Sequence, residues 1–216
     1  MLEYRTSAGG GLRLTSDFDE RRSQTDKKII GYAAVFNKLS ENLGNFKEKI
    51  APGAFANSLR RGADVRLLIN HEGLPLARTK ARNLRLSEDA TGLLIEADVD
   101  ESDPDFARVI PKLRSGTVNQ MSFGFYTISD SWEHVKPTPI RTLLEVELFD
   151  VSIVTFPAYP QTSVGARTAA RVYDDYVSSG RASGHVTGAT EAERQLKIAE
   201  AHRLRQIALH KYQTRS

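Results

Sequence analysis

The sequence predicts a β-rich α+β domain over residues 1–165, followed by a linker and a basic amphipathic helix. Most apolar runs have the length of a strand and are separated by turn residues, which favours strands over long helices. The composition changes after Gly165, where Ser, Gly, Arg and Asp replace the apolar runs. With 216 residues, 40% of them apolar, the chain is long enough to bury one substantial core.

Short apolar or alternating runs predict strands in the first half of the chain. Lys28–Phe36 is apolar on both faces, as in a buried strand, whereas Phe46–Ile50 alternates apolar and charged residues, as in a half-buried one. The charged stretch Asp17–Lys27 predicts a loop. The remaining elements expected here are an edge strand at Leu2–Thr6, strands at Leu12–Thr15 and Val65–Ile69, and a short helix at Ala54–Arg61.

The second half contains one predicted helix between strand patterns. Pro104 suits the first position of a helix that Ser102 or Asp103 can cap, and this helix is expected to run to Arg114. A hairpin is predicted before it, and two strands are predicted after it. These segments are Asn83–Ser87 with Leu93–Val99, then Gln120–Ile128, and finally Thr142–Phe156, the longest apolar run.

The tail divides into a predicted flexible linker, 166–188, and a helical segment, 189–216. Thr190 with Glu193 forms a capping box, and apolar residues recur with helical spacing as far as Tyr212. Residues 165–216 carry a net charge of +4, whereas residues 1–164 carry −1. The nearly neutral body predicts no nucleic-acid surface on the domain, and the basic tail could attract an acidic partner.

Several classes of protein are disfavoured by residues that the sequence lacks. With zero Cys there is no disulfide framework, iron–sulfur cluster or cysteine nucleophile, and no Gly-rich phosphate loop is present. His71-Glu72 does not start a zinc-protease motif, because Pro75 stands where the second His is required. No metal or cofactor is therefore expected. No membrane span is expected, and Met1–Gly10 has no apolar core of a signal peptide.

Ser122 is the candidate nucleophile that the strand pattern suggests. In Gln120–Phe125 (QMSFGF), alternation places Met121, Phe123 and Phe125 on one face, and Ser122 with Gly124 on the other. A strand anchored by three large apolar side chains would hold Ser122 rigidly against an open concavity. An ordinary polar residue on an outer strand face would give the same pattern.

A candidate base and candidate acids lie near strand ends and in the longest strand. His71 follows the apolar run Leu67–Ile69, so its imidazole could lie at the rim of a cleft, or it could simply form a hydrogen bond at a strand end. Asp150 has apolar neighbours and shares parity with Leu148 and Ser152, a position that is costly for a carboxylate unless it is paired. Glu145 and Glu147 are expected to form a solvated stripe.

Four segments in order resemble the prohead proteases of tailed phages, which mature the capsid. The segments are GYAAVF within Lys28–Phe36 followed by Phe46–Phe55 (FKEKIAPGAF), the strand Val65–His71 ending in Asn-His, Gln120–Phe125, and Leu148–Ala158 (LFDVSIVTFPA). The resemblance covers about residues 28–164. Since this family is similar in fold to herpesvirus assembly proteases, the resemblance implies a β-barrel surrounded by a few helices.

The resemblance also implies an activity and its residues. The chain would be a serine endopeptidase that cleaves capsid and scaffold segments during head assembly, and itself. Because linkers are where proteases nick a chain, the expected place of self-cleavage is Arg167–Gly188. By motif position Ser122 is the nucleophile, His71 the base and Asp150 the third member, where most relatives have Glu. Glu147 and Glu145 stay competitors for the third role, and backbone N–H groups of Ala158 or Tyr159 are the candidate oxyanion donors.

The resemblance places this activity inside the assembling prohead, in the cytoplasm of the host cell. The expected partners are the major capsid protein, its scaffold segment and a second copy of the chain. Two non-enzymatic alternatives stay open at the level of sequence. One is a scaffold or capsid-assembly protein acting through the basic helix Thr190–Tyr212, and the other is a sheet-edge binding module.

Overall fold

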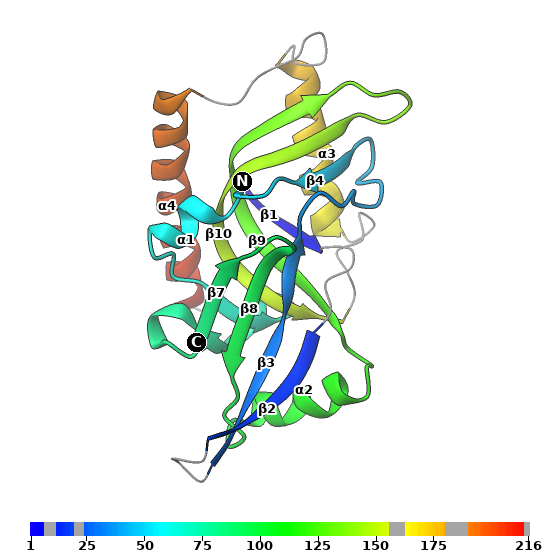
Figure 1. Ribbon diagram of the computed structural model, residues 1–216. Helices are drawn as coiled ribbons and strands as arrows, with labels where there is room; N and C mark the ends of the chain where they lie inside the picture. Colours follow the sequence, from blue (N-terminus) through cyan, green and yellow to red (C-terminus); the bar gives the residue numbers. More distant parts are fainter. Residues whose placement is uncertain (7–11, 20–23, 156–162, 180–189, 214–216) are drawn as a thin grey trace.

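Two β-sheets and a few helices make up the computed structural model, which describes residues 1–6, 12–19, 24–155, 163–179 and 190–213 (Figure 1). The larger sheet has six strands in the order β1-β9-β10-β5-β6, with β4 pairing to β10. Its strands are β1 (Leu2–Thr6), β4 (Lys47–Ile50), β5 (Arg66–Ile69), β6 (Glu72–Arg78), β9 (Gln120–Glu133) and β10 (Ile140–Val154). This sheet curls into a half-barrel, which confirms the expected β-rich α+β class (Figure 1).

The smaller sheet has four antiparallel strands in the order β2-β3-β8-β7. Its members are β2 (Leu12–Asp19), β3 (Gln24–Val35), β7 (Leu84–Glu88) and β8 (Gly92–Asp98). The β7–β8 hairpin confirms the prediction from the sequence. The loop predicted at Asp17–Lys27 is wrong over its described parts, since β2 and β3 pair as far as Asp19 opposite Gln24. Backbone pairing in a hairpin continues there despite the charged side chains.

The helices lie at the edges and ends of the sheets (Figure 1). They are α1 (Ala56–Arg60), the 3₁₀ turn η1 (Thr79–Ala81), α2 (Pro104–Arg114), α3 (Ser163–Ser178) and α4 (Glu191–Gln213). The predicted cap of α2 is Asp103, whose side chain accepts from the Asp105 N–H at 2.8 Å. No helix among the described residues is long and apolar enough to cross a bilayer.

Both sheets contribute to one main hydrophobic core. From β9, the predicted inward face is confirmed: Met121, Phe123 and Phe125 are 0–2% exposed, and the two Phe rings stack at 5.1 Å. The strands of the smaller sheet, together with strand β10, supply most of the other fully buried residues of this core. Those include Ile29, Leu93, Ile95, Leu143, Leu148, Val151 and Ile153. The core therefore fixes one face of β9 and leaves the other face free to carry polar groups.

The described part of the predicted linker, 166–179, differs from the prediction, and residues 180–188 of that linker lie outside the described residues. The first part of the expected linker is helix α3, whose Val172 and Tyr176 lie four residues apart and pack with Trp132 and Phe46. The rings of Trp132 and Tyr176 stack at 4.1 Å. This apolar pair, one helical turn apart, stabilises a segment whose composition alone resembles a linker.

Helix α4 begins as predicted and packs against the larger sheet. The Thr190 N–H donates to Glu193 Oε2 at 2.8 Å, and the Glu193 N–H donates to Thr190 Oγ1 at 3.4 Å, which completes the capping box. Ala201 of this helix is buried against Tyr126 and Phe149 of the sheet. The tail helix is therefore part of the folded body over its described side chains.

Candidate functional site

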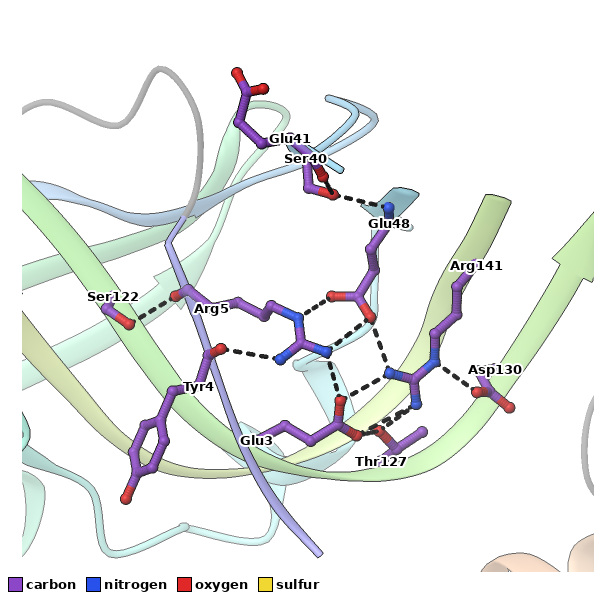
Figure 2. A network of polar contacts seen from close by, with 10 residues as sticks. All are labelled: Glu3, Tyr4, Arg5, Ser40, Glu41, Glu48, Ser122, Thr127, Asp130 and Arg141. Carbon is purple, nitrogen blue, oxygen red and sulfur yellow. Dashed lines mark hydrogen bonds and ion pairs between the residues drawn. The ribbon is translucent and has the colours of Figure 1, made fainter. Parts of the chain in front are cut away.

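Ser122 lies in β9 on the face opposite the core. Its neighbours Met121 and Phe123 point into the core, and its cross-strand partner on β10 is Ser152. The parity that the sequence predicts is therefore correct, but the open concavity is not, because Ser122 is 0% exposed. Strand β1 covers this side: Thr6 pairs with Ser122, and the Ser122 hydroxyl donates to the Arg5 carbonyl at 2.8 Å (Figure 2).

His71 is held in the tight turn between β5 and β6. Asn70 and His71 both have positive φ, 53° and 62°, as a two-residue hairpin loop of type I′ requires. The Asn70 side chain fixes this turn by accepting from the Thr155 N–H at 2.9 Å. The sequence placed His71 correctly at a strand end. It did not reveal β6, since Gly73 and Pro75 disfavour a strand, but Pro is tolerated in an edge strand such as this one.

The imidazole of His71 joins Ser122 to Asp150. Its Nε2 lies 2.8 Å from Ser122 Oγ, and its Nδ1 lies 2.5 Å from Asp150 Oδ1. The His71 side chain is 15% exposed and the Asp150 side chain 2%. The structure thus brings together three residues from β9, the β5–β6 turn and β10, which are 28 to 79 positions apart in the sequence.

A bulge in β10 turns Asp150 toward this site. Leu148 pairs with Phe125 and Asp150 with Gly124, so Phe149 is the extra residue. Leu148 and Val151 both lie in the core, whereas Phe149 packs on the opposite side against Tyr126 and Ile128. The expectation that Asp150 shares a face with Leu148 is therefore wrong, because the bulge breaks the simple alternation between them.

Ser152 and Gly124 complete the surroundings of the acid. The Ser152 hydroxyl donates to Asp150 Oδ1 at 3.0 Å and lies 3.1 Å from His71 Nδ1. A Cβ on Gly124 would approach Asp150 Oδ2 to 2.5 Å and the Tyr4 ring to 2.8 Å, so no larger residue fits without displacement. Ser152 is a site residue that the sequence pattern did not single out, although its parity with Asp150 was a usable signal.

Glu145 and Glu147 do not face His71, and they are not a solvated stripe. Glu147 is 2% exposed, and its carboxylate lies 2.5 Å from Arg61 and 3.8 Å from Arg205. Glu145 is 5% exposed and lies 2.6 Å from Arg194. Arg61, which follows the last residue of α1, and helix α4 supply these cations, which is why the two carboxylates can be buried.

A buried ion-pair network fastens β1 beside the site (Figure 2). Arg5 contacts Glu48 at 2.8 Å and Glu3 at 2.7 Å, and Arg141 contacts the same two carboxylates at 2.9 and 2.8 Å. Burial raises the pKa of Glu3, but the charges of Arg141 and Arg5, with hydrogen bonds from Arg141 and Thr127, outweigh it and lower that pKa to about 2. Burial likewise lowers the pKa of Arg141, and the carboxylates Glu3, Glu48 and Asp130 reverse this and raise it.

The candidate oxyanion donors, Ala158 and Tyr159, lie outside the described residues. Within the described parts of the chain, no group of three or more His, Asp or Glu side chains is arranged to hold a metal ion. The chemistry that the described groups offer is proton transfer. A serine hydroxyl, an imidazole and a carboxylate in this order can activate the hydroxyl as a nucleophile.

Comparison with known proteins identifies the family. A sequence profile described as caudovirus prohead serine protease matches residues 16–175. The prohead protease of Enterobacteria phage HK97 is 30% identical over 139 residues, which is 63% of this chain and 58% of that protein. The structure titled bacteriophage T4 capsid assembly protease, gp21, aligns with a TM-score of 0.46 at 12% identity, over 73% of this chain and 97% of that one. Because the profile covers well over half of the sequence, the chain belongs to the caudovirus prohead serine protease family.

Proposed function

We propose that this chain is a serine endopeptidase that cleaves capsid and scaffold segments, and itself, within the assembling phage head. One observation carries the proposal: His71 lies 2.8 Å from Ser122 Oγ through Nε2 and 2.5 Å from Asp150 through Nδ1. A base within hydrogen-bond reach of a nucleophile, itself oriented by a third group, is the signature of an activated serine.

In the proposed reaction, Ser122 Oγ attacks the carbonyl carbon of the scissile peptide while His71 Nε2 takes the hydroxyl proton. The C–N bond then breaks, and the same proton passes to the leaving amine. A water molecule then attacks the acyl-enzyme while His71 Nε2 takes its proton, and the proton returns to Ser122 Oγ as the ester bond breaks. Asp150 holds the Nδ1–H tautomer and stabilises the imidazolium that forms in each step.

The proposed substrates and site of action rest on the family. Members are described as prohead proteases, and the chain spans 58% of the length of the HK97 relative that it matches. We therefore propose the major capsid protein and its scaffold segment as substrates, in a prohead assembling in the host cytoplasm. Co-expression with the capsid protein from the same source is the matching experiment, and a shortened capsid product is the expected result.

A fluorophosphonate probe tests the chemistry directly. We expect covalent labelling of the wild-type chain at Ser122, and loss of labelling in folded Ser122→Ala and His71→Ala proteins. Ser152→Ala removes the other serine near the imidazole and should still be labelled at Ser122, but more slowly, because Asp150 loses a hydrogen bond. An unlabelled wild-type chain would favour the non-catalytic assembly protein instead.

A further inference from the structure

Strand β1 occupies the edge of the strand that carries the candidate nucleophile. It pairs antiparallel with β9 from Leu2 opposite Tyr126 to Thr6 opposite Ser122. The Arg5 carbonyl oxygen lies 2.8 Å from Ser122 Oγ, and Ser122 has no exposed surface. A peptide carbonyl of the chain itself therefore stands where an incoming peptide carbonyl would have to approach.

The hydroxyl of Ser122 has one hydrogen and two neighbours that compete for it. The Arg5 carbonyl can only accept, so a hydroxyl that donates to it does not donate to His71 Nε2. The contact with Nε2 then requires the imidazole to be the donor, the reverse of the arrangement that a general base needs. With β1 in place, the serine hydrogen is directed away from the base.

The same strand also covers the base. The Tyr4 ring lies 4.2 Å from the His71 ring, centroid to centroid, and fills the space beside Gly124. β1 thus contacts both the nucleophile and the imidazole through consecutive residues.

We propose that the edge of β9 from Tyr126 to Ser122 is the binding site for an extended polypeptide substrate, and that β1 is its internal occupant. A substrate strand takes the place of β1 by adding to the same sheet edge, so β1 has to separate from β9 before Ser122 can react. This inference rests on the proposed peptidase function, because it assigns the substrate site of that same serine.

The ion-pair network allows β1 to separate from β9 without leaving a buried charge unpaired. Glu3 and Arg5 leave together as a pair that is already in contact at 2.7 Å. Arg141 keeps Glu48 at 2.9 Å and Asp130 at 2.7 Å, so the groups that stay behind remain partnered. The network therefore holds β1 in place, yet the removal of β1 avoids the large penalty of an unpaired buried charge.

A disulfide lock tests whether β1 must move. The chain has no Cys, so Leu2→Cys with Tyr126→Cys introduces a single pair at directly opposed positions, away from Ser122. We expect fluorophosphonate labelling of Ser122 to be at least tenfold slower in the oxidised than in the reduced protein. Ser87→Cys with Leu94→Cys, an opposed pair on β7 and β8, is the matched control and should label equally in both states.

A loosened strand tests the same inference in the opposite direction. Arg5→Ala removes the guanidinium that contacts Glu3 and Glu48, so β1 should separate more often and labelling should be severalfold faster. Slower labelling of a folded Arg5→Ala protein would mean that β1 supports the site and does not block it, and would overturn the inference. If this variant does not fold, the disulfide comparison decides alone.

The remaining outcomes separate the two proposals. Equal labelling of the locked and reduced proteins would overturn the role of β1 while leaving the peptidase function intact. An absence of labelling in the wild-type, reduced and folded Arg5→Ala proteins alike, the last with β1 loosened, would overturn the peptidase function and, with it, the inference about β1.

Discussion

At the scale of single residues, two buried carboxylates on β10 have different partners and should have different roles. Asp150 contacts the His71 imidazole, whereas Glu147 contacts Arg61 at the end of α1. Asp150→Asn should slow fluorophosphonate labelling by about 10³–10⁴-fold, because the amide no longer holds the required tautomer. Glu147→Gln should leave labelling nearly unchanged and lower the free energy of unfolding by about 1–3 kcal/mol.

Labelling rates and urea unfolding of both folded variants check this prediction. Asp150→Glu serves as the conservative control and should be partly active, because it keeps the carboxylate and adds only one methylene group. If Glu147→Gln proves the more damaging to labelling, the assignment of Asp150 is wrong, and the Ser122–His71 pair could still stand.

Gly124 is a second residue at which the structure makes a sharp prediction. A methyl group there would approach Asp150 Oδ2 to 2.5 Å and the Tyr4 ring to 2.8 Å, so Gly124→Ala must displace both side chains. We expect labelling to fall at least tenfold because Asp150 is displaced from His71. The double variant with Tyr4→Ala separates the two contacts, because it restores labelling only if the Tyr4 ring was the obstacle.

At the scale of elements, helix α4 should stabilise the domain through its buried face. Ala201 is 3% exposed and packs against Phe149, whereas Leu196 on the same helix is 72% exposed. Ala201→Gln should lower the free energy of unfolding by about 1–3 kcal/mol, because a larger polar side chain cannot fit there. Leu196→Gln is the matched control and should change it by less than about 0.5 kcal/mol.

Urea unfolding of the full chain measures both effects. Equal stabilities for the two variants would show that α4 does not pack on the sheet in solution.

The docking of α4 predicts the effect of truncation. A chain ending near Gly165 would lose α3 and α4 and expose the buried Glu145 and Glu147, so its free energy of unfolding should be lower than that of the full chain.

At the scale of the whole molecule, the buried network ties stability to pH. The pKa of Glu3 is about 2 in the folded chain, against an ordinary value of 4.5. A carboxyl whose pKa is lowered by folding stabilises the fold above its ordinary pKa and loses that contribution as the pH falls toward the folded value. Glu3 should therefore contribute on the order of 3 kcal/mol near neutral pH, lost between about pH 4.5 and 2.

Unfolding by urea at a series of pH values from 6 to 2 tests this contribution. The wild-type chain should lose stability steeply over that window, and Glu3→Gln should show a flatter dependence. Glu41→Gln, at an exposed carboxylate, is the control and should follow the wild-type curve. Parallel curves for Glu3→Gln and wild type would contradict the assignment.

The sequence alone determined the β-rich class, most strand positions, the cap of α4 and three candidate site residues. Alternation in β9 was informative because large side chains at 121, 123 and 125 must share the core face, which sends Ser122 to the other side. His71 could be placed at a strand end because an apolar run stops there. The four motifs added the order of the segments, and the comparison with the family confirmed the resemblance.

Only the tertiary structure decided what covers Ser122, which face Asp150 takes and where the two glutamates find partners. Each answer depends on contacts between segments distant in sequence: Arg5 reaches Ser122, the β10 bulge is set by pairing with β9, and Arg194 of α4 reaches Glu145. A periodic pattern reports the face of a residue within its own element. Burial, bulges and ion pairs depend on neighbours that only tertiary packing brings into contact, so local periodicity does not predict them.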